Sequence, residues 1–303
     1  MRFSAVLFAV LVLPGLAMAD DKPLLLVSAS YQKDIIALCE TDGTVVWQHK
    51  TGGPPKGHAG HHEVQMLDNG NILYHDDWDT VREMKLDGTE VWKYKSSNVH
   101  AFTRLKNGHT MIAESATDRI IVVDQSGKIV SETPLGKDGR GKTRQAEVLP
   151  NGNYLVCAER PGTVTEYSPD GTIVWEYEIG TRVYGAIRLA NGNTLIGSGS
   201  GNSFVEVTPE KKVVWQIAKN VPGTKISLAW TACLKELPNG HIVLDNCHAG
   251  PDNPQLFELD KERNVVWQFN EFELVGNGMA CFDYLPPAKA AKVRQQIAAL
   301  PQK

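Results

Sequence analysis

The stretch PNGNYLVCAERPGTVTEYSPDGTIVW (Pro150 to Trp175) contains both of the signatures that decide the fold. The first signature is an Asn-Gly turn followed by an apolar strand, and the second is an Asp-Gly turn followed by a strand that ends in tryptophan. Asn-Gly and Asp-Gly supply the positive φ angles that tight hairpins require, so each pair predicts a reversal between two strands. The stretch therefore predicts a unit of four strands, with one strand before the first turn, two between the turns and one after the second.

The same two signatures recur along the chain. Other copies of the Asn-Gly signature are DNGNILY (Asp68 to Tyr74), KNGHTMI (Lys106 to Ile112), ANGNTLI (Ala190 to Ile196) and PNGHIVL (Pro238 to Leu244). Other copies of the tryptophan signature are DGTVVW (Asp42 to Trp47), DGTEVW (Asp87 to Trp92), EKKVVW (Glu210 to Trp215), ERNVVW (Glu262 to Trp267) and the degenerate SGKIVS (Ser126 to Ser131). Successive Asn-Gly turns lie 38 to 48 residues apart, which is the period of a four-stranded propeller blade.

The two ends of the chain complete one blade between them. The first strands, Leu24 to Ser28, Asp34 to Leu38 and Val45 to Gln48, have no innermost strand before them, whereas NGMACFDYL (Asn277 to Leu285) is an innermost strand with no outer strands after it. The sequence therefore predicts an all-β fold, a six-bladed β-propeller over residues 20–286, closed by a C-terminal strand. Closure removes free sheet edges. Residues 287–303 are predicted to form a short helical tail.

The N-terminus and the composition limit the possible partners. Residues 1–19 combine a basic residue, a short apolar run and Ala-Met-Ala, which is typical of a cleavable signal peptide, and no cysteine follows to carry a lipid anchor. We therefore expect a secreted or periplasmic protein without membrane insertion. The formal net charge of −4 argues against binding to nucleic acid, which needs a basic face. Among the five cysteines, Cys233 has two possible disulfide partners, Cys247 and Cys281.

Candidate catalytic residues share one position in the repeat. The residue seven positions before the Asn-Gly turn is His62, His100, Arg144 or Tyr184 in four consecutive repeats. Equivalent positions on inner strands surround one axis, so we expect these side chains to converge at the mouth of a central tunnel. An ion pair between Arg144 and Glu147 or Glu159 is the structural alternative for the arginine, and Tyr184 alternatively plugs the tunnel.

The irregular connections on the same face supply further candidates, because binding residues concentrate on variable loops. Trp78 and Trp230 lie outside the repeated tryptophan position and are candidate ligand platforms, with His248 and Glu159 as further ligand-binding candidates. GHAGHHE (Gly57 to Glu63) is histidine-rich, and His58, His61 and His75 are candidate ligands of a divalent metal. A solvated loop explains His58 and His61 equally well.

The DGTVVW and LPNGNYLV patterns resemble the PQQ-like propeller superfamily and, within it, the arylsulfotransferase-like propellers. The resemblance covers nearly all of the chain after residue 19 and implies a propeller fold. It further implies a tunnel histidine as nucleophile if the chain shares the arylsulfotransferase activity. Quinoprotein dehydrogenases have eight blades and a vicinal cysteine pair, so we do not expect this chain to bind PQQ.

Three functions remain open from the sequence. The leading hypothesis is an exported propeller that binds a small polar or anionic ligand, or a partner protein, at its histidine-rich face. The alternative is an enzyme that uses His62, His100 and Arg144, either for sulfuryl transfer or for metal-assisted action on an anionic glycan with Tyr184 as base. The third is a purely structural scaffold.

Overall fold

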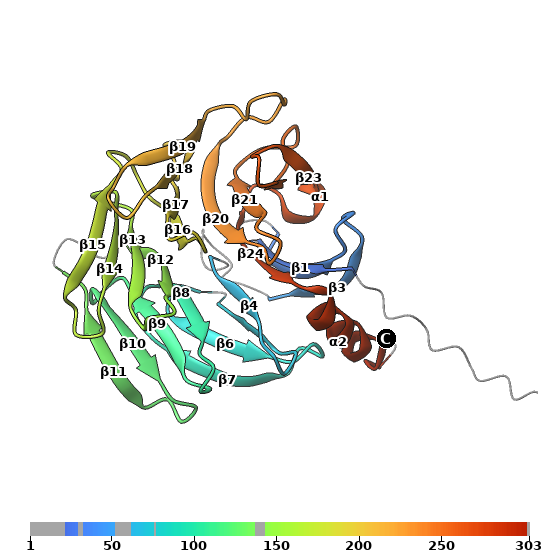
Figure 1. Cartoon of the computed structure of the whole chain (residues 1–303). Helices are drawn as coiled ribbons and strands as arrows, with labels where there is room; N and C mark the ends of the chain where they lie inside the picture. The colour runs from blue at the N-terminus through green and yellow to red at the C-terminus, as the bar shows by residue number, and fades with distance from the viewer. Residues whose placement is uncertain (1–21, 30–32, 52–61, 76, 137–142, 302–303) are drawn as a thin grey trace, which may run out of the picture.

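The computed structural model describes residues 22–29, 33–51, 62–75, 77–136 and 143–301. These residues form six four-stranded antiparallel sheets arranged as blades around one axis (Figure 1). The predicted six-bladed propeller is confirmed. The predicted signal segment, residues 1–19, lies outside the described residues.

The strands of each blade follow one another from the centre of the ring outward (Figure 1). Blades 1 to 3 are β24 (Met279–Leu285), β1 (Leu24–Ala29), β2 (Ile35–Cys39), β3 (Val45–Lys50); β4 (Val64–Met66), β5 (Ile72–Tyr74), β6 (Thr80–Met84), β7 (Glu90–Lys95); and β8 (Val99–Arg104), β9 (Thr110–Glu114), β10 (Arg119–Val123), β11 (Ile129–Pro134). Blades 4 to 6 are β12 (Thr143–Val148), β13 (Tyr154–Ala158), β14 (Thr163–Tyr167), β15 (Ile173–Glu178); β16 (Gly185–Arg188), β17 (Thr194–Gly197), β18 (Ser203–Val207), β19 (Val213–Ala218); and β20 (Trp230–Glu236), β21 (Ile242–Cys247), β22 (Leu256–Leu259), β23 (Val265–Phe269).

Blade 1 contains both ends of the propeller. Strand β24 pairs antiparallel with β1, with Leu285 opposite Leu24 and Phe282 opposite Val27. All four of these side chains are buried. Burial of a large apolar side chain stabilises a fold by about 1.5–3 kcal/mol. This strand pair therefore contributes strongly to holding together two segments that lie far apart in the sequence.

The outermost strands are half-exposed, and their tryptophans join neighbouring blades. Trp47 Nε1 donates to the Leu86 carbonyl at 2.9 Å, and Trp175 and Trp267 make the same kind of bond to the following blade. In each case the acceptor is a backbone carbonyl at or beside the Asp-Gly-type turn of that blade. The repeated tryptophan is therefore structural, which is why it recurs with the period of the blade.

A second repeated contact lies at the Asn-Gly turns. Asn71 donates to Glu83 at 2.6 Å, and Glu83 accepts from Arg104 of the next blade at 2.8 Å. The Arg104 guanidinium lies 5.3 Å from the centre of the Trp92 ring. Blades 4 and 5 repeat this set with Asn153, Glu166, Arg188 and Trp175. Paired and stacked in this way, these arginines serve the blade interface.

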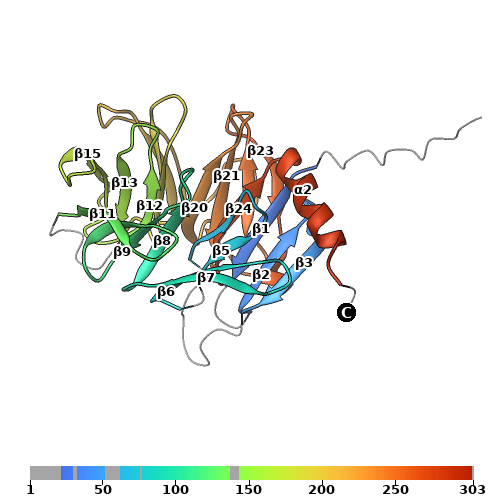
Figure 2. The ribbon, with the colours of Figure 1, turned by 90° about the horizontal axis from the view of Figure 1, so that it is seen from below.

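The C-terminal tail forms helix α2 (Pro287–Ala298), as expected, and it packs on the outside of blade 1 near β3 and β24 (Figure 2). Ala290 and Val293 are its buried residues, and Arg294 binds Glu40 at 2.6 Å. A single turn, α1 (Phe272–Val275), precedes β24. In the described part of the chain, neither helix is long and apolar enough to cross a membrane.

All five cysteines lie within the described residues, and all five are buried free thiols. The disulfide that the sequence left possible at Cys233 is therefore absent from the structure. Cys233 and Cys281 lie on β20 and β24, which are adjacent inner strands of the ring.

Candidate functional site

A pocket of about 320 Å³ lies where the inner strands begin, on the face of the irregular connections. We call it the histidine pocket. Its lining residues come from several blades and include residues from both inner strands and connections: His62, Trp78, Arg144, Glu159, Arg182, Tyr184, Trp230, Cys247, His248, Gly278 and Ala280. Seven of the eleven residues proposed from the sequence are among them.

β-Bulges in the inner strands turn side chains toward this end of the ring. The pairing register of β8 with β9 shifts between Val99 and Ala101, which leaves His100 in the bulge. The register of β12 with β13 shifts between Thr143 and Ala146, around Arg144. A bulge bends its strand and redirects the extra side chain, so these interruptions of the ladder place His100 and Arg144 at the site.

His62 is held by its neighbours on three sides. Its Nδ1 lies 2.6 Å from the Tyr184 hydroxyl, its ring stacks on Trp78 with the centroids 4.7 Å apart, and its backbone N–H donates to His75 Nε2 at 2.9 Å. Burial raises the pKa of Tyr184 well above its usual value, so the phenol keeps its proton. A protonated hydroxyl can donate to Nδ1 or accept from it, so the direction of this bond follows the tautomer of the His62 ring.

His75 is fully buried beneath the pocket. Its Nε2 accepts from the His62 backbone, and its Nδ1 donates to the Asp77 carbonyl at 2.9 Å. Burial lowers the pKa of His75 to about 4, against the opposing effect of the Asp77 carbonyl, so the ring is neutral. Both nitrogens thus hold the backbone around His62, and metal binding by His75 would require it to give up one of these bonds.

Two arginines share one carboxylate at the pocket wall. Arg144 donates through Nε to Glu159 Oε2 at 2.8 Å and through Nη2 to the same oxygen. Arg182 Nη1 donates to Glu159 Oε1 at 3.0 Å. The Glu159 side chain is only 7% exposed. Two positive charges against one negative charge leave this wall with a net charge of about +1.

His100 lies behind the pocket wall and is 4% exposed. Arg144 Nη1 is 2.7 Å from its Nε2, and its ring centre is 4.5 Å from that of Trp78. Burial first, then His62 and Arg144, hold the pKa of His100 well below its usual value. A neutral His100 accepts a hydrogen bond from Arg144 and fixes the orientation of the guanidinium.

The aromatic residues form two walls of the histidine pocket. Trp78 stacks on His62, and Trp230 contacts Tyr184 edge to face, with 6.2 Å between the centroids. His248 also contacts Trp230 edge to face, with 6.2 Å between the centroids. Both tryptophans predicted as ligand platforms thus line the pocket, as does His248.

The sequence analysis missed one charged residue of the site. Arg182 lies on the connection into blade 5, two residues before Tyr184, and pairs with the same carboxylate as Arg144. Its position two residues before Tyr184, a candidate tunnel residue, could have indicated that it lies at the site. His58 and His61 lie outside the described residues. Within the described residues, no three His, Cys, Asp or Glu side chains are grouped closely enough to hold a metal ion.

Two family models match parts of the chain. Residues 81–244, more than half of the chain, match the model described as Mal s 1 allergenic protein-like. Residues 13–148 match a model described as outer membrane protein assembly factor BamB, which supports the predicted PQQ-like repeat. No curated protein matches the chain significantly.

Several solved structures share the fold. A protein of unknown function from Bacteroides caccae is 23% identical, with a TM-score of 0.73 over 88% of this chain and 99% of that one. A catalytically inactive histidine-to-alanine variant of virginiamycin B lyase from Staphylococcus aureus, solved with quinupristin, is 12% identical, with a TM-score of 0.58 over 88% of this chain and 97% of the lyase. At these identities the likeness concerns the fold alone.

Proposed function

The chain belongs to the Mal s 1 allergenic protein-like family, and we propose that it is an exported propeller that binds a small organic anion in the histidine pocket. The observation that carries this proposal is the arrangement of Arg144 and Arg182 around Glu159 at the wall of the pocket. The pattern of residues 1–19 and the match to a model named for the outer membrane support export.

The charge of the wall favours an anion. A guanidinium has five N–H donors, and the contacts of Arg144 with Glu159 and His100 use three of them. Its remaining donors and those of Arg182 can bind a carboxylate or sulfate, and charge-assisted bonds of this kind are the strong ones. An anion would also neutralise the net charge left by the shared carboxylate.

The size and walls of the pocket favour a ligand with a single ring. A volume of about 320 Å³ is at the lower end of the range of roughly 300–1,000 Å³ for small-molecule sites. Trp78 and Trp230 offer flat faces for an aromatic or sugar ring. We therefore propose an aryl or glycosyl carboxylate or sulfate as the ligand class. A protein partner would have to insert an acidic side chain to use the same contacts.

Titration of the protein's tryptophan fluorescence tests the proposal, since two tryptophans line the pocket. The probes are phenylacetate, 4-nitrophenyl sulfate and glucuronate, with neutral phenylacetamide as the matched control for phenylacetate. We expect at least one anion to bind and phenylacetamide to bind at least tenfold more weakly. The proposal would be overturned if none of the three anions binds. It would also be overturned if phenylacetate is the only anion that binds and phenylacetamide binds equally well.

Matched arginine variants place the anion in the histidine pocket. Arg144→Met is expected to weaken binding about tenfold or more, which corresponds to about 1.4 kcal/mol for one lost charge-assisted contact. Arg119→Met removes an arginine on blade 3 whose partners are Glu114 and Glu132, and should leave the affinity unchanged. Equal weakening by both variants would assign the effect to net charge rather than to this site.

An enzymatic role for the same pocket is supported by the contact between His62 and Tyr184. In sulfuryl transfer, the His62 ring carries its proton on Nδ1 and donates it to the Tyr184 oxygen, so the lone pair of Nε2 can attack the sulfur of an aryl sulfate. The phenolate leaves, and a phenol acceptor later takes the sulfuryl group from the histidine. Arg144 stabilises the charge on the transferred group. The raised pKa of Tyr184 suits a hydrogen-bond donor rather than the base considered from the sequence.

Release of 4-nitrophenol from 4-nitrophenyl sulfate in the presence of a second phenol tests this role. The enzymatic hypothesis expects turnover by the wild type and its loss in His62→Ala. Binding of 4-nitrophenyl sulfate without turnover would leave the chain as a binding protein.

A further inference from the structure

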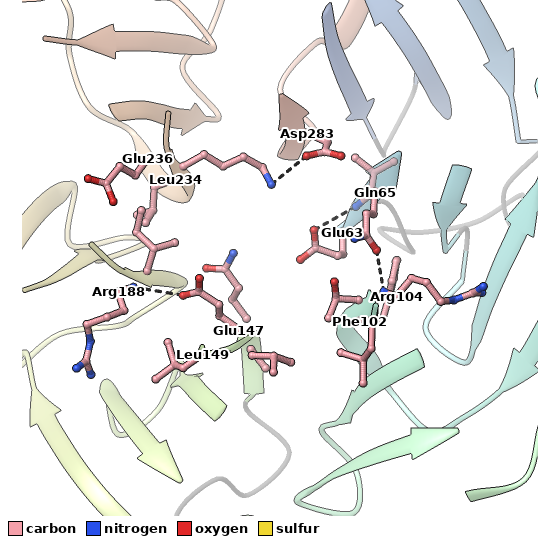
Figure 3. A pocket seen from close by; sticks show the side chains of 18 of the residues that line it. Glu63, Gln65, Phe102, Arg104, Glu147, Leu149, Arg188, Leu234, Glu236 and Asp283 are labelled. Atoms are coloured by element: carbon pink, nitrogen blue, oxygen red, sulfur yellow. Dashed lines mark hydrogen bonds and ion pairs between the residues drawn. The ribbon is translucent and has the colours of Figure 1, made fainter. Parts of the chain in front are cut away.

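A second cavity, of about 860 Å³, lies farther along the same inner strands and extends to Pro150 beside an Asn-Gly turn (Figure 3). We call it the carboxylate cavity, after Glu63, Glu147, Glu236 and Asp283 in its lining. All six blades contribute to its walls. The Asn-Gly face therefore contains the larger of these two cavities.

Most of the positive charge in the lining is directed elsewhere. The guanidinium groups of Arg104 and Arg188 point away from the cavity (Figure 3) and pair with Glu83 and Glu166 at 2.8 and 2.9 Å. Lys235 reaches across to Asp283, with Nζ 3.1 Å from Oδ1. Lys106 is the remaining basic residue of the lining, and the carboxyl groups of Glu63, Glu147 and Glu236 outnumber it, which gives the cavity an excess of negative charge when they are ionised.

Glu63 and Glu147 lie on facing walls (Figure 3). Glu63 Oε1 accepts from the Cys281 thiol at 3.1 Å, and Glu147 Oε2 accepts from the Arg188 backbone N–H at 3.2 Å. These partners are a thiol and a backbone amide, neither of which carries a compensating charge. Such carboxylates gain from a cation that enters the cavity, because a buried charge is costly when it is unpaired.

The titration of Glu147 agrees with this charge distribution. Burial raises the pKa of Glu147 to about 7. The backbone N–H of Arg188 and the charges of Lys235 and Arg188 oppose the rise, while Glu236 adds to it. The charge of Glu147 in turn contributes to the raised pKa of the buried Cys157 thiol. The positive charges around Glu147 are thus too few to offset its burial.

We propose that the carboxylate cavity binds an organic cation, an extended aliphatic amine with separated ammonium groups. The carboxylates stand on different blades, which suits separated charges, and within the described residues they do not gather as a metal site. Phe102, Leu149 and Leu234 supply apolar wall for the aliphatic chain. This site is independent of the histidine pocket, which has the opposite charge.

Calorimetric titration with two five-carbon probes tests the proposal. Cadaverine is a diamine and glutarate is a dicarboxylate of similar length, so the pair isolates the sign of the charge. We expect cadaverine to bind the wild type and glutarate not to bind. We also expect at least tenfold tighter binding of cadaverine at pH 8 than at pH 6, because burial raises the pKa of both Glu147 and Glu63 to about 7, and such carboxyls are mostly ionised at pH 8 and mostly protonated at pH 6.

A matched pair of substitutions locates the site. Glu147→Gln should weaken cadaverine binding about tenfold at pH 8 and reduce its pH dependence, whereas Glu262→Gln, the same change in an exposed turn, should do neither. No binding of cadaverine at pH 8, equal binding of glutarate, or equal weakening by both variants would overturn the proposal. The first two outcomes need only the wild type, so they do not depend on the folding of a variant.

Discussion

The two ends of the propeller axis differ in charge although the same strands build both. On β12, Arg144 faces the histidine pocket and Glu147, three residues later, lines the carboxylate cavity. The first end has an excess of positive charge and aromatic walls, whereas the second has an excess of negative charge and more aliphatic walls. The scaffold fixes where each ring of side chains lies, and the residue at each level decides what that end can bind.

The two carboxylates Glu159 and Glu147 show how strongly the surrounding groups determine the effect of a carboxylate on stability. Glu159 accepts from two arginines, whereas Glu147 accepts from a backbone amide. The first is paired with two guanidinium groups, and the second is a carboxyl whose pKa burial raises to about 7. The same substitution at the two positions should therefore have opposite effects on stability.

The largest expected effect belongs to Glu159→Gln. It leaves Arg144 and Arg182 beside each other without their shared carboxylate, and breaking a buried pair costs about 3–5 kcal/mol. Since both arginines are partly exposed, we expect a loss of about 2–3 kcal/mol in the free energy of unfolding in urea at pH 7.

Glu132→Gln is the matched control for Glu159→Gln. Glu132 is half-exposed and pairs with Arg119, and such surface pairs contribute about 0–1 kcal/mol. A loss for Glu159→Gln no larger than that of the control would mean that the histidine pocket does not depend on the shared carboxylate.

The second effect has the opposite sign. Glu147 has a folded pKa of about 7, above its ordinary value of 4.5, so the folded state holds a proton that the unfolded state has released. The stability of the wild type should fall as pH rises from about 4.5 to 7 and then level off. Glu147→Gln removes the part of this fall that belongs to Glu147, while Glu63, whose pKa burial also raises to about 7, keeps its own part. We expect the substitution to stabilise the protein by about 1–2 kcal/mol at pH 8.

Urea unfolding of the wild type and Glu147→Gln between pH 5 and pH 8 measures this difference. The gain of the variant over the wild type should grow with pH across the window. A constant difference would contradict the raised pKa, and a loss of stability at pH 8 would mean that Glu147 has a charged partner in solution.

The sequence was sufficient for the fold because its signals are local and repeated. Asn151-Gly152 and Asp170-Gly171 mark hairpins wherever they occur, and the tryptophan repeats because each blade meets the next in the same way. The histidine pocket was partly predictable for the same reason, since counting from the turns aligned His62, Arg144 and Tyr184.

The sequence did not reveal features that depend on several blades at once. The bulge at His100 is an interruption of pairing and has no repeated signal. The sequence left the partner of Arg144 open between Glu147 and Glu159. The structure shows that Arg144 pairs with Glu159. The carboxylate cavity was missed because no strand supplies more than one of its carboxylates, and Glu63, Glu147, Glu236 and Asp283 belong to four different blades.

The third prediction concerns the hydrogen bond between Tyr184 and His62. Tyr184→Phe leaves His62 Nδ1 without its hydroxyl partner, and the loss of one such bond costs about 1 kcal/mol in unfolding free energy. The ¹⁵N chemical shifts of the His62 ring should change as well, because Nδ1 no longer shares a hydrogen bond with the phenol. Tyr177→Phe, a ring stacked beside Trp175, is the control and should change neither quantity.

The smallest effect is expected at the thiols between the two ends. Ala280 lines the histidine pocket, and its neighbour Cys281 donates to Glu63 of the carboxylate cavity. Burial raises the pKa of Cys281 well above its usual value, so it is a poor nucleophile as well as inaccessible.

We expect that the folded protein does not react with a thiol reagent and that the unfolded protein reacts at five thiols per chain. We also expect that a reductant does not shift the urea midpoint. Three thiols after unfolding would instead mean that two cysteines are joined, and a reductant-sensitive midpoint lost in Cys281→Ala would identify Cys281 as one of them. In that case a disulfide, rather than the contact between the Cys281 thiol and Glu63, would lie between the histidine pocket and the carboxylate cavity.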